Sequence, residues 1–135
     1  MTDVAFAVLP EFSAALAAAS QSSPAAVHRL QVGLARLVLD LAPPAAPQQL
    51  ELAAAFIEGR AESSALTEAR QDCWIYVGSL ACGCSLADSA SAHAIMTCLE
   101  PSPDAHSPQA LLEQVERVLR CGVERAQVLQ VLQQG

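Results

Sequence analysis

Apolar residues recur at steps of three and four along most of this chain, and that spacing places them on one side of a helix. The pattern predicts helices over residues 10–20, 24–41, 47–58, 66–84, 85–99, 108–121 and 123–133. Ser-Pro pairs mark two of the starts, because serine caps a helix and proline fits its first turn. Gly59 and Gly122 suit helix ends. No window alternates apolar and polar residues as a strand does, so we expect an all-α fold.

The predicted helix over 66–84 contains the only Trp and the only Tyr of the chain. Its first half is amphipathic, with Leu66, Ala69 and Cys73 on one face, but the polar face disappears from Cys73 onward. A helix that is apolar all round must be enclosed on several sides. We therefore expect residues 1–135 to form one domain, a bundle of six to seven helices around a central helix near 66–84.

Charge bears on the partners of this protein. Fourteen acidic residues against seven basic ones, all of them Arg, give a net charge of -7. Nucleic acid and anionic membranes would be repelled, whereas a basic protein partner would be attracted. A surface that is acidic only for solubility is the alternative. No membrane span is expected either, because the apolar stretch 73–87 is shorter than the ~20 residues that a spanning helix needs.

The cysteines do not predict a metal site. They are Cys73, Cys82, Cys84, Cys98 and Cys121, an odd number without the spacing of a disulfide framework. Cys82 and Cys84 would diverge by roughly 200° on a helix, and no Cys-x-x-Cys pair exists. A thiol in an Ala-rich helix is more often a small buried hydrophobe. Asp3 stands where a secretory signal would carry a basic residue, so we expect a cytoplasmic protein with reduced thiols, no metal and no cofactor.

We find no catalytic constellation in the sequence. None of the histidines has a Ser or Cys at motif spacing; His28 is expected on the outer part of its helix, His93 within an Ala-rich stretch and His106 in a loop. Glu113 and Glu116 form a solvated face with Arg117 and Arg120 one turn later. There is no phosphate-binding loop. We therefore expect a protein that is not an enzyme.

Arg70 and Trp74 lie one helical turn apart, so a guanidinium over an indole ring is geometrically available. One interpretation is an Arg stem packed on a half-buried Trp at the rim of the bundle. The other is an aromatic anchor for a partner, because Trp and Arg are enriched among the residues that dominate interfaces.

The segment LELAAAFIEGRAESSALTEARQDCWIYVGSLA resembles the fifth family of immunity proteins from bacterial polymorphic-toxin systems, and related Ala-rich helical immunity proteins. The matching positions lie between residues 50 and 99. They are Glu58-Gly59-Arg60 at the end of one helix, Ala69-Arg70 with Trp74 in the next, and Ala90, Ala92, His93 and Ala94 in the third.

This resemblance implies a small cytosolic antidote that binds one toxin domain and occludes its active site. A basic toxin domain would suit the acidic chain. We expect an acidic patch flanking Trp74 to be the binding face, with contacts from Glu58, Glu62, Glu68, Arg70, Asp72 and Trp74. Two other functions remain open: a structural or adaptor module that self-associates, for example as a homodimer, and a helical bundle that binds a small ligand beside Trp74 and the cysteines.

Overall fold

The computed structural model describes residues 17–18, 21, 23–40, 45–79 and 86–134. These residues form helices and turns and no strand, which confirms the all-α prediction. The helices are α3 (Pro24–Arg36), α4 (Ala46–Ile57), α5 (Ser63–Ser79), α6 (Leu86–Cys98), the 3-10 helix η1 (Pro103–Ala105), α7 (Pro108–Arg120) and α8 (Arg125–Gln134). The helix predicted over 10–20 lies outside the described residues except for 17–18. The helices predicted over 47–58, 85–99, 108–121 and 123–133 are found with boundaries within two residues. That predicted over 24–41 ends earlier, at Arg36, and α5 spans Ser63–Ser79 where a helix over 66–84 was predicted.

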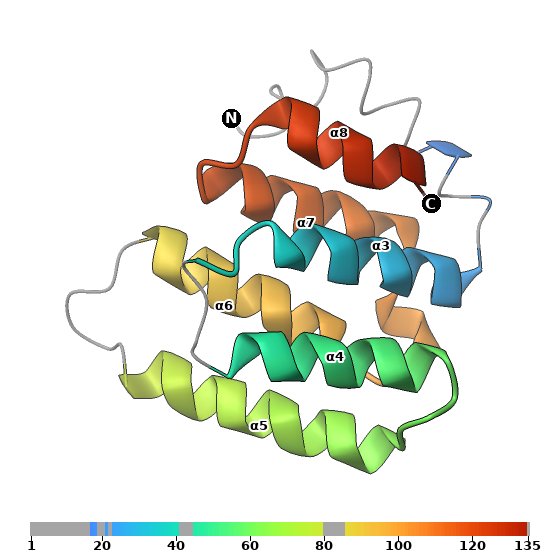
Figure 1. Ribbon diagram of the computed structural model, residues 1–135, viewed down its shortest axis with the longest axis vertical. Coiled ribbons are helices and arrows are strands. Elements are labelled where there is room, and N and C mark those ends of the chain that lie inside the picture. The colour runs from blue at the N-terminus through green and yellow to red at the C-terminus, as the bar shows by residue number, and fades with distance from the viewer. Residues whose placement is uncertain (1–16, 19–20, 22, 41–44, 80–85, 135) are drawn as a thin grey trace.

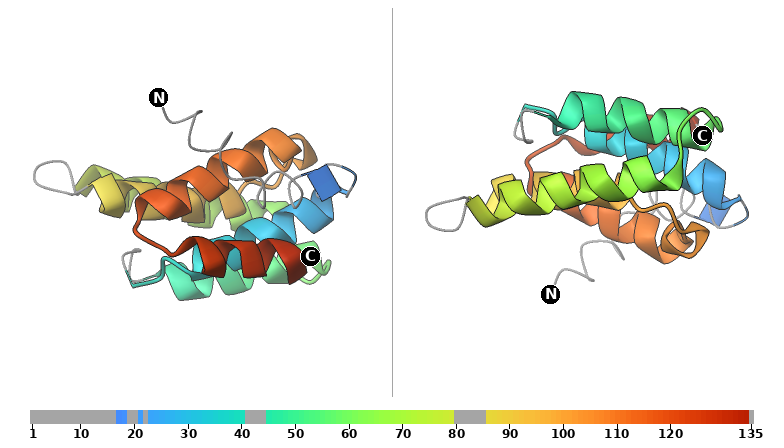
Figure 2. Two further views of the ribbon diagram at one scale, coloured as in Figure 1. Left: turned by 90° about the horizontal axis from the view of Figure 1, so that it is seen from above. Right: turned by 90° about the horizontal axis from the view of Figure 1, so that it is seen from below.

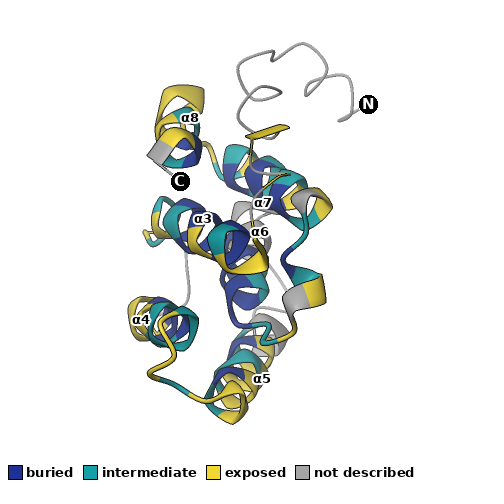
Figure 3. Ribbon diagram, turned by 90° about the vertical axis from the view of Figure 1, so that its right-hand side faces the viewer, coloured by how far each residue is buried: buried dark blue, intermediate teal, exposed yellow. Residues whose placement is uncertain are grey.

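The helices form two layers, which Figure 3 shows end-on. One layer contains α8, α3 and α4, and the other contains α7, α6 and α5 (Figures 1 and 2). Contacts between neighbours agree with this order: α3 packs on α4 and α8 within its layer and on α6 and α7 across it. Helix α6 contacts α3, α4, α5 and α7. The two middle helices of the layers, α3 and α6, are therefore the most enclosed.

The apolar core has two parts, separated along the layers. One part gathers Leu34 of α3 with Val115 and Val118 of α7 and Val128 of α8. The other gathers residues of α4, α5 and α6, such as Leu66 and Ile95, with Leu99 just after α6 and with Val32 and Ala35 of α3. Residues of α6 take part in both, because Ala94 belongs to the first and Ala92, Ile95 and Met96 to the second. Short side chains let α6 accept neighbours on several sides.

The expectation of a central helix near 66–84 is corrected on one point. Helix α5 exists, but it lies at the end of its layer and packs mainly on α4 and α6. Its apolar stripe, Leu66, Ala69 and Cys73, faces these neighbours, whereas Trp74 and Ile75 are exposed. Large apolar side chains after Cys73 suggested enclosure, yet the helices that are enclosed are α3, with its long apolar stripe, and α6, with its small residues.

The helix ends follow the chemistry that the sequence predicts. Gly59 and Gly122 have φ of +80° and +91°, a left-handed conformation that glycine adopts without steric cost. Ser23 and Ser107 cap α3 and α7, each with its hydroxyl oxygen accepting a hydrogen bond from the backbone N–H three residues later. Within the described residues, no helix is both long and apolar enough to cross a membrane.

We expect Ser107→Ala to lower the free energy of unfolding by about 1 kcal/mol, because the N–H of Ala110 loses the acceptor that caps α7. Ser107→Asp, which keeps an acceptor, and Ser107→Gly should each change it by only a few tenths. Urea denaturation of the three variants measures the difference. If alanine were as stable as glycine and aspartate at this position, the cap would contribute nothing.

Candidate functional site

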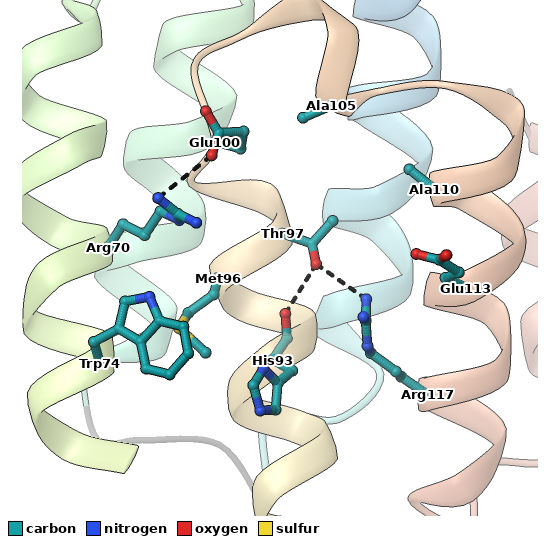
Figure 4. Close-up of a pocket in the computed structure, with 10 residues that line it drawn as sticks. All are labelled: Arg70, Trp74, His93, Met96, Thr97, Glu100, Ala105, Ala110, Glu113 and Arg117. Atoms are coloured by element: carbon teal, nitrogen blue, oxygen red, sulfur yellow. Dashed lines mark hydrogen bonds and ion pairs between the residues drawn. The ribbon is translucent and has the colours of Figure 1, made fainter. Parts of the chain in front are cut away.

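A cleft of about 260 Å³ opens between α5, α6, η1 and α7 (Figure 4). Helix α5 contributes Arg70 and Trp74, and the segment from α6 to η1 contributes further residues. The complete lining is Arg70, Trp74, His93, Met96, Thr97, Glu100, Ala105, Ala110, Glu113 and Arg117. The cleft is therefore rich in charged and aromatic side chains, although most of the surrounding core is aliphatic.

Arg70 closes one end of the cleft through an ion pair with Glu100, with an N–O distance of 3.4 Å. This contact fastens α5 to the turn that follows α6. The ring partner of Trp74 is His93 of α6, which meets the indole edge-on with ring centroids 5.8 Å apart. The stacking of Arg70 on Trp74 that the sequence allows is thus replaced by two other contacts, and Figure 4 shows the guanidinium directed at Glu100.

On the other side of the cleft, Arg117 of α7 is held by Thr97 of α6. Its guanidinium donates to the Thr97 hydroxyl at 3.3 Å, and that hydroxyl donates to the backbone carbonyl of His93 at 3.0 Å. Burial, with a contribution from the charge of Arg117, lowers the pKa of His93. His93 is therefore neutral at neutral pH, and the fixed charges around the cleft belong to the two Arg and the two Glu.

The outer face of α5 is the second candidate surface. We define it as the exposed residues Glu68, Gln71, Asp72 and Ile75, with Trp74 at its edge. Trp74 and Ile75 are 50% and 71% exposed, and they are the large hydrophobic side chains left in solvent among the described residues. At 100° per residue, Glu68, Asp72 and Ile75 fall within roughly 60° of one another, and Trp74 lies roughly 100° from Ile75. An apolar side chain is thus placed beside two carboxylates.

The six residues predicted to bind a partner separate into distinct groups. Glu68 and Asp72 lie on the outer face of α5, whereas Arg70 and Trp74 line the cleft. Glu58, at the end of α4, forms an ion pair with Arg60 at 3.0 Å. Glu62 is exposed just before α5. The structure does not bring the four carboxylates together around Trp74, so the predicted patch is reduced to Glu68 and Asp72; their role in binding stays a prediction.

Comparisons with protein-family models, with curated proteins and with solved structures find no match for this chain. The resemblance to immunity proteins over residues 50–99 therefore stays a prediction. The cleft and the outer face of α5 are the two features of the described structure that bear on function.

Sequence reasoning missed four participants: Ile75, Glu100, Glu113 and Arg117. Ile75 lies at helical spacing from Glu68 and Asp72, but it belongs to the stretch after Cys73 that was expected to be apolar all round and therefore enclosed. Glu113 and Arg117 were interpreted as a solvated face. Only the packing of α7 beside α6 shows that Arg117 reaches Thr97.

The prediction that His28 lies on the outer part of its helix is wrong, because the side chain is buried. Its ring stacks on that of His106, with centroids 3.7 Å apart, and its Nε2 donates to the carbonyl of Cys98 at 2.6 Å. His106 donates from Nε2 to the carbonyl of Glu100 and bonds the Gln31 side chain through Nδ1. Burial is the main cause that lowers the pKa of both rings, that of His28 to about 4. The pair fastens the loop before α7 to α3.

The described thiols that were candidate ligands behave as core residues. Cys73 and Cys98 are buried and donate to the carbonyls of Ala92 and Ala94. Burial raises the pKa of Cys73 to about 11 and raises that of Cys98 as well, so both thiols are protonated and weakly reactive at neutral pH. Cys82 and Cys84 lie outside the described residues. Among the residues that are described, no three His, Cys, Asp or Glu are grouped so as to hold a metal ion.

Proposed function

We propose that this chain is a non-catalytic binding protein whose outer face of α5 docks on a basic surface of another protein. The observation that carries the proposal is Ile75, 71% exposed on an end-of-layer helix and placed beside Glu68 and Asp72. A large apolar side chain in solvent gains free energy when a partner covers it, about 1.5–3 kcal/mol for complete burial.

Trp74 extends this surface toward the cleft. Its half-exposed ring can contact a partner while its other side stays against His93. An aromatic side chain that is already held by a neighbour loses little conformational entropy on binding. Aromatic residues also often dominate the binding energy of an interface. Helix α5 therefore offers two apolar anchors within two adjacent positions.

Charge selects the partner. Glu68 and Asp72 flank Ile75 on a chain with a net charge of -7. Complementary charge speeds association and disfavours acidic partners. Together with the family resemblance, this supports a cytoplasmic immunity protein that covers a basic toxin domain; a protein that acts by covering its target needs no reaction centre.

Self-association is the second candidate, and the same exposed Ile75 favours it. In a symmetric dimer through this face, Glu68 and Asp72 would approach the same residues of the second copy, because a two-fold interface brings one patch onto itself. Repulsion between them opposes such a dimer, so we favour a different partner. The molar mass of the purified chain by light scattering distinguishes the two functions.

To test the proposal, the immobilised chain is used to capture proteins from a lysate of the native host. We expect one dominant basic protein. Capture of this protein should be lost with Ile75→Glu, which replaces the apolar anchor by a charge. It should also be lost with the double variant Glu68→Arg/Asp72→Arg, which reverses the charge of the face. The matched control is Glu51→Arg/Glu124→Arg, the same charge change at exposed positions on α4 and before α8.

Two results would contradict the proposal. One is capture that the α5 variants leave as strong as in the wild type. The other is recovery of nothing but further copies of the chain, which would favour self-association. Circular dichroism of each variant ensures that a lost partner does not reflect a lost fold.

A further inference from the structure

Two pairs of opposite charges at identical helical spacing on α7 behave differently. Glu116 and Arg120 form an ion pair, as residues four apart on a helix commonly do. Glu113 and Arg117 have the same spacing, but no ion pair between them is found in the described part of the chain. Arg117 is drawn instead to Thr97 of α6, at 3.3 Å. Packing against α6 thus leaves a carboxylate and a guanidinium apart, both lining the cleft (Figure 4).

The charges of the cleft identify the ligand class. Arg70 and Glu100 neutralise each other. Glu113 and Arg117 remain, one turn apart, and neither forms an ion pair with another described residue. A simple anion would be attracted by Arg117 but repelled by Glu113. A simple cation would be attracted by Glu113 but repelled by Arg117. A ligand that carries one positive and one negative charge close together satisfies both groups.

The uncharged part of the cleft is small and combines apolar side chains with the polar side chains of His93 and Thr97. Trp74 stands half-exposed at its mouth, and Met96 is buried beneath it. The volume of about 260 Å³ lies below the roughly 300 Å³ at which pockets for drug-sized ligands begin, so it suits one amino acid better than a nucleotide or a peptide. An aromatic side chain would complement the indole, because aromatic rings prefer edge or offset contacts with one another.

We propose that this cleft binds a free aromatic amino acid, with its carboxylate on Arg117, its ammonium on Glu113 and its ring against Trp74. Arg117 can still offer further N–H donors to a carboxylate after its bond to Thr97. Neutral His93, between Trp74 and Arg117, adds a polar wall without a competing charge. The cleft shares Trp74 with the edge of the outer face of α5, but Glu113 and Arg117 lie on α7 and Ile75 does not line the cleft, so each proposal can be tested by itself.

Trp74 is the only tryptophan of the chain, so its fluorescence reports on the cleft directly. We expect the Trp74 fluorescence to change saturably when L-phenylalanine is added. Calorimetry should give the same dissociation constant as the fluorescence titration. Phenylalanine amide lacks the carboxylate charge and N-acetylphenylalanine lacks the ammonium. Each should bind at least about tenfold more weakly than phenylalanine, because each leaves one charged group of the cleft without a partner. Comparing these two analogues also separates a free amino acid from the N- or C-terminal residue of a peptide.

Arg117→Gln and Glu113→Gln should each weaken phenylalanine binding about tenfold or more. The matched controls are Arg120→Gln and Glu116→Gln, each of which removes one partner of the Glu116–Arg120 ion pair on the same helix, and Ile75→Glu on the outer face of α5. These three should bind as the wild type does. The proposal is overturned if neither method detects binding up to roughly 10 mM phenylalanine, if N-acetylphenylalanine binds as tightly, or if the Arg117 and Glu113 variants keep wild-type affinity.

Discussion

Replacing Leu34 by alanine is expected to lower the free energy of unfolding by about 3 kcal/mol, whereas Ile75→Ala should change it by less than about 0.5 kcal/mol. Leu34 is fully buried in the middle of α3, between α7, α8 and α6, and truncation leaves a cavity that the neighbouring helices cannot fill. Ile75 projects from α5 into solvent, so its truncation removes almost no buried area. Urea denaturation of both variants measures the two values.

Leu34→Met is the control, because a volume-conserving change in the core should cost less than about 1.5 kcal/mol. Equal losses from Leu34→Ala and Ile75→Ala would mean that α5 is enclosed after all. In that case the surface proposed for partner binding would not exist.

Stability should fall by roughly 2–3 kcal/mol between pH 7 and pH 4 through His28 alone. The pKa of His28 is about 4 in the folded protein and close to 6.5 when unfolded, because burial disfavours the charged ring. Within this window the unfolded chain takes up a proton that the folded chain refuses. The contribution of His28 to stability is therefore complete above about pH 6.5 and is lost as the pH falls toward 4. His106, whose pKa is also lowered, acts in the same direction.

Urea denaturation at several values between pH 7 and pH 4 tests this for the wild type and for His28→Gln. Glutamine retains an N–H donor for the carbonyl of Cys98 but does not titrate, so the variant should be less stable at pH 7 and show a shallower decline with acid. A decline of the same steepness in both proteins would show that other groups cause the acid sensitivity.

Amphipathic helices were predictable from the sequence because their apolar stripes are wide and their ends carry strong signals. Helix α7 is an example, since Ser107, Pro108 and Gly122 mark its limits and Leu111, Val115 and Val118 face the core. Here local chemistry determines the structure almost completely.

Which helices are enclosed by neighbours and which lie at the end of a layer was not predictable in this way. Enclosure depends on which faces meet neighbours, and small residues allow more neighbours than large ones. Helix α6 is enclosed although its side chains are short, whereas α5 carries the largest side chain and exposes half of it. His28 was misplaced for the same reason: its partners, the carbonyl of Cys98 and the ring of His106, come from segments about seventy residues or more away.

Of the candidate site, the sequence identified the helix and its aromatic residue but not the arrangement. Arg70, Asp72 and Trp74 share one helix, and their faces follow from the helical repeat. The ion pair of Arg70 with Glu100 joins α5 to the turn after α6, and the contact of Arg117 with Thr97 joins α7 to α6, so no spacing along the chain reveals them.

Site-specific crosslinking tests most directly whether the outer face of α5 is the surface that binds a partner. A photoreactive benzoylphenylalanine is placed at position 75 in one protein and at the exposed position 130 of α8 in another, and each is irradiated in the native host. We predict one basic protein crosslinked from position 75 and absent from position 130. A partner crosslinked only from position 130, or position 75 joined only to other copies of this chain, would contradict that assignment.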